Sequence, residues 1–176
     1  MTIQPDTKDW AWVLRERCPE CGLEAASIQR DDVAPTIRQN ASSWMTVLQR
    51  DDARQRPRPD MWSPLEYACH VRDVLRLYDE RLQLMLEQDD PLYENWDQDE
   101  TAIEQRYGEQ DPAVVAVELR EAADRVADRF AALQPEDWSR TGRRSDGAAF
   151  SVESFSQYFL HDLIHHLHDV GGDSAA

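Results

Sequence analysis

The stretch "SVESFSQYFLHDLIHHLHDV", residues 151–170, contains four of the chain's five histidines within eight positions. Its apolar side chains recur at intervals of three and four, which is the spacing of one face of an α-helix. Ser151 is a favourable N-cap, and two glycines follow the pattern at its end. The stretch therefore predicts a helix from Val152 to about Val170.

The histidines divide into two sets on a wheel of this helix. With Phe159 at the centre of the apolar face, His168, His161 and His165 fall at roughly 180°, 200° and 240°, just past the edge of that face. His166 falls at about −20°, among the core residues, where we expect it to pack or to cap internally. An i, i+4 pair such as His161 and His165 can reach one metal ion.

Three other segments have helical periodicity and a recognisable start. Pro35 suits the first position of one helix. Ser63 and Glu66 form a capping box for a second helix, which should end near Glu87. Asp111 caps a third, whose apolar stripe continues for five turns. Four amphipathic helices without a strand pattern predict an all-α fold, a four-helix bundle.

The segments between these helices complete the predicted organisation. Residues 88–112 form an acidic crossover with a short helix around Asp99 to Tyr107, and "TGRRSDGAAF", residues 141–150, is a turn-rich loop. A helix is expected from Thr7 to about Arg17. The chain has the length of one domain, with an N-terminal extension over 1–33 packed on a bundle over 34–172 and a tail over 173–176.

His70 borders the apolar face of the helix that follows Ser63. Packing that face against the last helix could bring His70 beside His161 and His165 at the margin of the core. Three imidazoles leave coordination positions open, as in a catalytic site, and they favour Zn, Ni, Fe or Cu over Mg or Ca. The spacing alone keeps a simpler alternative open, because histidines near a helix C-terminus are also stabilised by the helix dipole.

Composition and charge restrict the function classes. The net charge of −16 disfavours nucleic acid as a partner, because affinity for phosphates comes largely from Lys and Arg. We find no segment resembling a membrane span or a secretory signal, and the three cysteines do not suggest a disulfide framework. These features predict a cytoplasmic protein.

Cys18 and Cys21 have the CxxC spacing of half a zinc ribbon or of a redox dithiol. No second cysteine pair follows, and Cys69 falls inside a predicted helix. The sequence therefore favours ordinary reduced thiols. A metal site completed by a histidine or cysteine from elsewhere in the fold remains the alternative.

Two stretches resemble the signature regions of the DinB superfamily. "DMWSPLEYACHVRD", residues 60–73, is similar to its WS-x-x-E-x-x-x-H helix start, and residues 137–170 resemble its final His-x-x-x-His helix, preceded by a Trp and a Gly-containing loop. The resemblance spans about residues 35 to 170. It implies an up-down-down-up four-helix bundle that binds a metal ion through three histidines. By that similarity the ligands are His70, His161 and His165, and His168 is the main competitor.

The resemblance also implies an activity. Family members with assigned chemistry include thiol-dependent S-transferases and the mycothiol-dependent maleylpyruvate isomerase. A divalent transition metal (Zn, Ni or Fe) would then activate a low-molecular-weight thiol of the mycothiol or bacillithiol class for transfer to an electrophile. The alternatives are a metal-dependent hydrolase that activates water and a non-catalytic metal-binding stress or interaction module. A homodimer is a further expectation.

The catalytic residues remain unknown from the sequence. Glu66 and Asp73 lie about one turn before and after His70, so they could orient an imidazole or move a proton. Each also has a structural role available. Glu66 belongs to the capping box, and Asp73 can pair with Arg72 or Arg76 on a solvated face.

Overall fold

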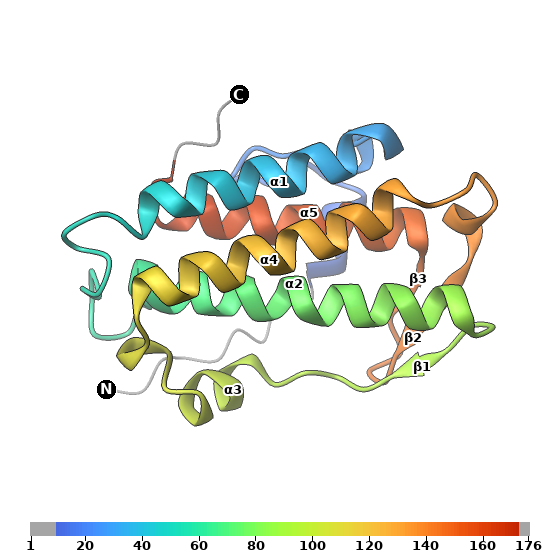
Figure 1. The fold of residues 1–176 in the computed structure, drawn as a ribbon. Helices are drawn as coiled ribbons and strands as arrows, with labels where there is room; N and C mark the ends of the chain where they lie inside the picture. Colours follow the sequence, from blue (N-terminus) through green and yellow to red (C-terminus); the bar gives the residue numbers. More distant parts are fainter. Residues whose placement is uncertain (1–9, 173–176) are drawn as a thin grey trace.

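The structure, a computed structural model, describes residues 10–172. Four long helices form the bundle: α1 (Arg30–Val47), α2 (Pro64–Glu87), α4 (Pro112–Ala131) and α5 (Val152–Asp169). In Figure 1, α1 and α5 run in one direction, whereas α2 and α4 run in the other. The predicted up-down-down-up bundle is therefore confirmed. Thr7, where an N-terminal helix was expected to begin, and the tail over 173–176 lie outside the described residues.

Side-chain caps begin three of the four helices as predicted. The Ser63 hydroxyl accepts a hydrogen bond from the Glu66 amide at 3.2 Å, and the Ser63 amide donates to Glu66 Oε2 at 2.8 Å. Asp111 caps α4, and Ser151 caps α5. These caps satisfy amide groups that have no partner within the helix.

The first bundle helix begins earlier than predicted. α1 starts at Arg30, so Pro35 lies inside the helix instead of at its first position. Asp31 and Asp32 occupy the first turn, where acidic side chains interact favourably with the helix dipole. Proline lacks one amide donor, and the longer helix retains its remaining backbone bonds.

A small sheet lies at the end of the bundle where α2 finishes and α5 begins (Figure 1). Strand β1 (Leu92–Tyr93) pairs in parallel with β2 (Thr141–Arg144), which pairs antiparallel with β3 (Ala149–Ser151). The predicted turn-rich loop is therefore partly a hairpin. At Gly142 an added Cβ would lie 2.8 Å from Met85 Cγ, so the sheet packs closely on α2. The crossover before α4 contains the short helices α3 (Gln98–Glu104) and η3 (Tyr107–Glu109).

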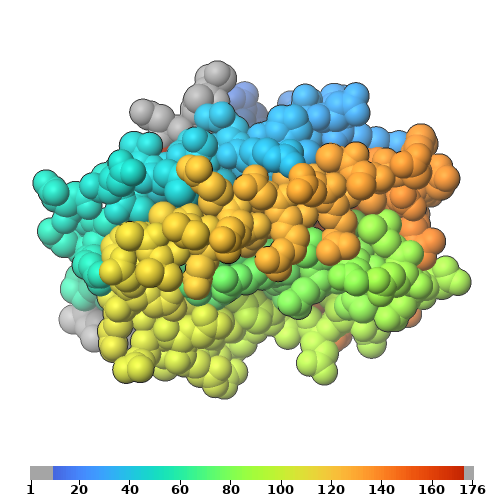
Figure 2. Space-filling view, in the orientation of Figure 1, coloured from blue at the N-terminus to red at the C-terminus, as the bar shows by residue number. Residues whose placement is uncertain are grey.

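The N-terminal segment packs on α5 through two 3-10 helices, η1 (Trp10–Leu14) and η2 (Ala25–Ser27). A further 3-10 helix, η4 (Asp137–Ser139), precedes the hairpin. In the space-filling view, α4 covers the face between α1 and α2 (Figure 2). None of the helices in residues 10–172 combines the length and apolar character needed to cross a membrane.

Candidate metal centres

Helix α5 contributes potential metal ligands to three groups. The first, which we call the bundle site, consists of His70, Asp162 and His166. The second, the Cys–His site, consists of Cys18, Cys21, His161 and His165. Within each group, one potential ligand atom per residue lies within 4.8 Å of the others. Glu20, His165 and Asp169 form a third such group, which shares a histidine with the Cys–His site.

The structure separates the predicted ligands. His161 and His165 lie together, with ring centroids 5.2 Å apart. His70 belongs to the bundle site, and in residues 10–172 no metal-ligand group joins it to either of them. His168 is exposed and belongs to no such group in the same residues, although its ring centroid is 6.5 Å from that of His165.

Asp162 and His166 are potential ligands that the sequence analysis did not single out. Their i, i+4 spacing equals that of His161 and His165, but they lie one residue later, which rotates them by about 100° around the helix. The helical wheel did contain a sign of this arrangement. It places His166 on the apolar side of the helix, and that side faces α2 and therefore His70. His166 was expected to pack or to cap internally, because it falls among the core residues on the helical wheel.

His70 provides the strongest sign of a ligand in the bundle site. Its side chain is only 1% exposed, and neither Nδ1 nor Nε2 has a hydrogen-bond partner in the described part of the chain. Its ring centroid is 4.8 Å from that of His166. Leaving a buried polar atom without a partner costs about 1–3 kcal/mol. A bound metal ion would remove this cost for one of the two nitrogens.

Asp162 and His166 complete this site from one side of α5. Asp162 Oδ1 lies 3.4 Å from His166 Nε2, close to the separation of about 3.4 Å between two ligands of a tetrahedral Zn ion. His166 Nδ1 lies 3.2 Å from Asp169 Oδ2, so this carboxylate orients the ring with Nε2 toward the site.

Aromatic rings enclose the bundle site. The Trp62 and Trp96 ring centroids lie 5.3 Å and 5.4 Å from that of His70, and the Trp96 ring is stacked on the imidazole. Tyr67 packs against His166 with a centroid separation of 5.3 Å. Such walls keep bulk water away and strengthen electrostatic interactions within the site.

Protonation differs sharply between the two histidines of the bundle site. Burial lowers the pKa of His70 to about 3, and the nearby His166 charge acts in the same direction, so His70 is neutral. Burial alone would lower the pKa of His166 and raise that of Asp162, but the attraction between the two reverses both effects. The pKa of His166 is therefore raised and that of Asp162 is lowered. A cation is thus favoured at this position, and a metal ion could replace the proton.

The Cys–His site joins two segments that are far apart in the sequence. Cys18 Sγ lies 3.7 Å from His165 Nδ1. Cys18, His161 and His165 are buried, and Cys21 is half-buried. Burial raises the pKa of Cys21 to about 11 and lowers that of His161 to about 4. The CxxC motif, for which the sequence favoured ordinary reduced thiols, therefore lies directly beside the histidine pair.

Glu66 and Asp73, the two candidate catalytic residues, each form hydrogen bonds with an arginine. The Arg56 guanidinium donates to both carboxylate oxygens of Glu66, and although burial raises the pKa of Glu66, this contact and the cap lower it overall. Asp73 accepts hydrogen bonds from Arg72 at 2.9 Å and from Tyr107 Oη at 2.6 Å.

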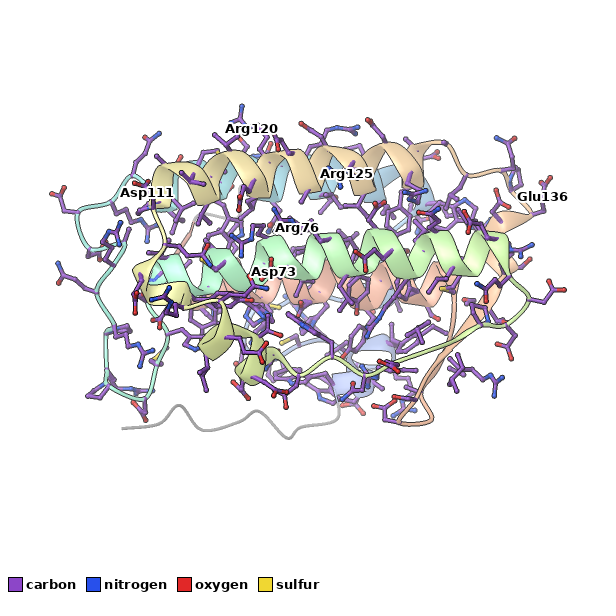
Figure 3. All side chains as sticks on the ribbon, turned by 60° about the horizontal axis from the view of Figure 1, so that its bottom comes forward. Asp73, Arg76, Asp111, Arg120, Arg125 and Glu136 are labelled. Atoms are coloured by element: carbon purple, nitrogen blue, oxygen red, sulfur yellow. The ribbon has the colours of Figure 1, made fainter. Side chains whose placement is uncertain are left out.

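Asp73 also pairs with Arg76, 3.3 Å away, and both side chains are labelled on α2 in Figure 3. The expected arginine partners are confirmed. The expected solvated face is wrong for Asp73, because its carboxylate is buried in a network with Arg72 and Tyr107. Neither Glu66 nor Asp73 belongs to a metal-ligand group in the described residues.

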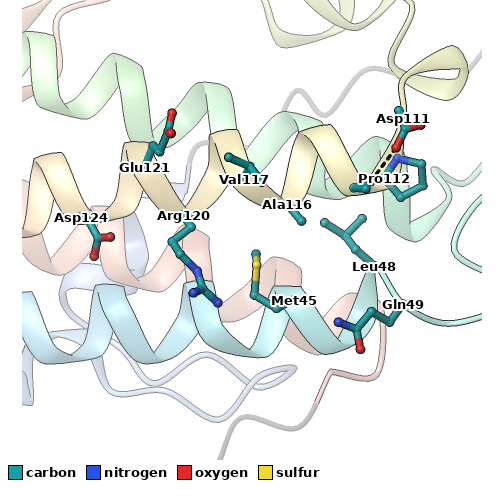
Figure 4. A pocket seen from close by; sticks show the side chains of 11 residues that line it. Met45, Leu48, Gln49, Asp111, Pro112, Ala116, Val117, Arg120, Glu121 and Asp124 are labelled. Atoms are coloured by element: carbon teal, nitrogen blue, oxygen red, sulfur yellow. Dashed lines mark hydrogen bonds between the residues drawn. The ribbon is translucent and has the colours of Figure 1, made fainter.

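A groove of about 710 Å³ lies elsewhere, between α1 and α4 (Figure 4). Apolar side chains such as Met45, Leu48 and Val117 line most of it, and Arg120 and Asp124 add charge at one end. None of the ligands described above lines this groove. The potential metal ligands therefore lie away from this groove.

Comparisons with known proteins agree with this fold. The family model of the DinB superfamily matches residues 36–170. A solved structure, that of YfiT from Bacillus subtilis, is similar with a TM-score of 0.70 at 18% sequence identity, over 80% of this chain and 83% of that one. YfiT is described as a probable metal-dependent hydrolase with an unusual four-helix bundle topology. No curated protein matches the sequence. The match over most of its length shows that this chain belongs to the DinB superfamily.

Proposed function

We propose that this protein is a divalent-metal-dependent enzyme whose metal ion is bound by His70, Asp162 and His166. We further propose that it activates a low-molecular-weight thiol for transfer to an electrophile. The observation that carries the metal assignment is His70, whose two ring nitrogens are buried and have no partner in the described residues. A neutral imidazole in this state is a ready metal ligand.

The donor set suits a catalytic ion. The two imidazoles are borderline donors and the carboxylate is a hard donor, a combination that favours Zn, Fe or Ni. Three protein ligands leave coordination positions for a substrate. A metal ion held there would supply Lewis-acid chemistry by lowering the pKa of a thiol or water that it binds. Asp162 stands where the family resemblance led us to expect a histidine, and its charge would moderate that acidity.

The surrounding residues position the ligands and exclude water. Asp169 accepts a hydrogen bond from His166 Nδ1 and thereby keeps Nε2 directed at Asp162 and His70. The Trp62 and Trp96 rings both pack against the His70 ring and restrict its movement.

The positions of the nearby carboxylates favour thiol transfer over hydrolysis. Hydrolysis of an unactivated bond commonly uses a carboxylate as general base, but Glu66 is tied to Arg56 and Asp73 to Arg72. A thiol needs less assistance, because coordination alone shifts its pKa far enough to form the nucleophile. Such thiols are abundant in a reducing cytoplasm, which is the location we propose.

Hydrolysis is the second candidate because the structurally similar YfiT is described as a probable metal-dependent hydrolase. The same three ligands would serve it. The two activities differ in their requirement for an added thiol, and this difference can be measured directly.

The test uses untagged protein loaded in turn with Zn²⁺, Ni²⁺ and Fe²⁺. Each form is assayed with mycothiol, bacillithiol or glutathione plus a chromogenic aryl halide, and separately with a chromogenic ester without thiol. We expect metal- and thiol-dependent product formation that is lost in His70→Ala and His166→Ala but retained in His168→Ala. Ester turnover without thiol would select the hydrolase. An unchanged metal content in His70→Ala would overturn the site assignment.

A further inference from the structure

The Cys–His site lies outside the proposed catalytic centre and has a different donor set. Its ligands form two pairs, a C-x-x-C pair at Cys18 and Cys21 and an H-x-x-x-H pair at His161 and His165. These are the spacings with which each half of a Cys₂His₂ zinc site is built. In an ordinary zinc finger the two halves are close in sequence, whereas here the fold of the whole bundle brings them together.

The distances fit a tetrahedral ion. Bond lengths of about 2.3 Å to sulfur and 2.0–2.1 Å to nitrogen place a sulfur and a nitrogen ligand about 3.6 Å apart. The observed separation of Cys18 Sγ and His165 Nδ1 is 3.7 Å. One potential ligand atom from each of the four residues lies within 4.8 Å of the others.

Backbone hydrogen bonds fix the conformation of the turn that contains Cys18 and Cys21. The Gly22 amide donates to the Cys18 carbonyl at 2.9 Å, and the Cys18 amide donates to the Leu23 carbonyl at 2.9 Å, which closes a tight turn around "CPECG". Gly22 has φ +75°, a conformation that residues with a side chain rarely adopt. The two thiols are therefore held near each other by backbone structure.

The histidine side of the site contains an independent sign of a ligand. His161 is 4% exposed, and its Nε2 is buried without a hydrogen-bond partner in the described residues. On the other histidine, His165 Nε2 faces Glu20 at 3.4 Å and Asp169 at 3.7 Å, which leaves Nδ1 for Cys18. A carboxylate behind a ligand histidine is the usual outer partner in zinc sites.

We propose that Cys18, Cys21, His161 and His165 bind a second ion, a structural Zn²⁺ that fastens the N-terminal segment to α5. Two thiolates and two imidazoles fill a tetrahedral coordination sphere and neutralise the ion, so no position remains for a substrate. Trp10 packs against both imidazoles, with ring centroids 5.7 Å from His161 and 5.2 Å from His165, and covers the site. The ion therefore holds the fold together and takes no part in turnover.

The experiment measures zinc in the untagged full-length protein and in variants of each site. The double variant Cys18→Ser/Cys21→Ser should lose one equivalent relative to the parent, whereas Cys69→Ser and His168→Ala should lose none. Co²⁺ added to the apo protein should give a thiolate-to-metal charge-transfer band. That band should persist in His70→Ala, which separates this proposal from the catalytic one.

A second measurement needs no variant and so remains valid if the cysteine variants fail to fold. X-ray absorption at the zinc edge of the parent should show sulfur together with nitrogen in the first shell. The proposal is overturned by a shell of nitrogen and oxygen alone, by a Cys18–Cys21 disulfide in the purified protein, or by equal zinc content in the parent and the double variant.

Discussion

The bundle site and the Cys–His site share helix α5 but differ in the residues that surround them. His166 of the bundle site projects toward α2, where two tryptophans enclose its partner His70. One residue earlier, His165 projects toward the N-terminal segment, where it meets Cys18. The bundle site offers three potential ligands of mixed hardness, and the Cys–His site offers four, two of them soft.

This difference shows how one i, i+4 spacing can serve two purposes. A shift of one residue turns the ligand pair by about 100°, so consecutive residues of α5 face different parts of the fold. The partner supplied by each part then decides the chemistry. Three ligands leave a metal ion open to a substrate, whereas four ligands close it.

The largest expected effect is the loss of turnover on replacing His70, which distinguishes the bundle site from the Cys–His site. His70→Ala should remove one metal equivalent and reduce turnover roughly a thousandfold, since loss of the ion removes several kcal/mol of transition-state stabilisation. His70→Leu should leave metal-free protein equally stable or stabilise it by about 1–3 kcal/mol, because two unpartnered nitrogens disappear. Steady-state rates and denaturant unfolding test this, and a strong loss of apo-protein stability in His70→Leu would contradict it.

The Cys–His site should show the opposite behaviour. Zinc in excess of its dissociation constant by a factor of about 1,000 stabilises a fold by about 4 kcal/mol, which corresponds to roughly 10 °C in Tm for a domain of this size. Cys18→Ser/Cys21→Ser should lose that stabilisation and should retain turnover below its Tm. Thermal unfolding with and without a chelator measures the effect. An unchanged Tm would show that the ion does not support the fold.

The two sites should also differ in pH dependence. His166 carries a proton at neutral pH because its pKa is raised, and binding at Nε2 expels that proton, whereas His70 is already neutral. Zinc affinity of the bundle site should therefore rise about tenfold per pH unit. At the Cys–His site both thiols must lose a proton when zinc binds, and the pKa of Cys21 is raised to about 11. Zinc affinity of this site should therefore rise about a hundredfold per pH unit.

Competition with a chromophoric chelator between about pH 6.5 and 8 can measure these slopes. The Cys18→Ser/Cys21→Ser variant isolates the bundle site, and His70→Ala isolates the Cys–His site. Equal slopes in the two variants would remove the distinction between an imidazole site and a thiolate site.

A smaller effect is expected at Asp169, whose carboxylate contacts a histidine of each site. It lies 3.2 Å from His166 Nδ1 and 3.7 Å from His165 Nε2. Asp169→Asn should weaken metal binding at both sites by about 10–100-fold. Glu20→Gln is the matched control, because Glu20 contacts only His165 of the two and should affect the Cys–His site alone. An effect of Asp169→Asn on only one site would contradict the proposal that this carboxylate supports a histidine in both.

The smallest effect is predicted for His168, which the sequence made the main competitor for a ligand role. Its side chain is exposed, and it belongs to no metal-ligand group in residues 10–172. His168→Ala should change stability by no more than about 0.5 kcal/mol and leave both metal equivalents in place. Loss of one equivalent would return His168 to the ligand set.

The sequence was sufficient for the elements whose determinants are local. Ser63, Asp111 and Ser151 mark helix starts because a cap acts within one turn. Periodic apolar residues then specify which face of each helix is buried, and four such faces predict the bundle. The small sheet was missed because β1 pairs with β2 across about 50 residues, and strands of two to four residues carry little pattern of their own.

Sequence reasoning also directed attention to His70 and the last helix as candidate ligand positions, since residue type and i, i+4 spacing are local properties. The tertiary structure decided which potential ligands lie close together. Whether His70 faces His165 or His166 depends on the rotation of α5 against α2, and a turn of about 100° exchanges the answer. Likewise, only the path of the N-terminal segment over α5 places Cys18 beside His165. Such contacts are set by the packing of the whole core, which no single stretch of sequence contains.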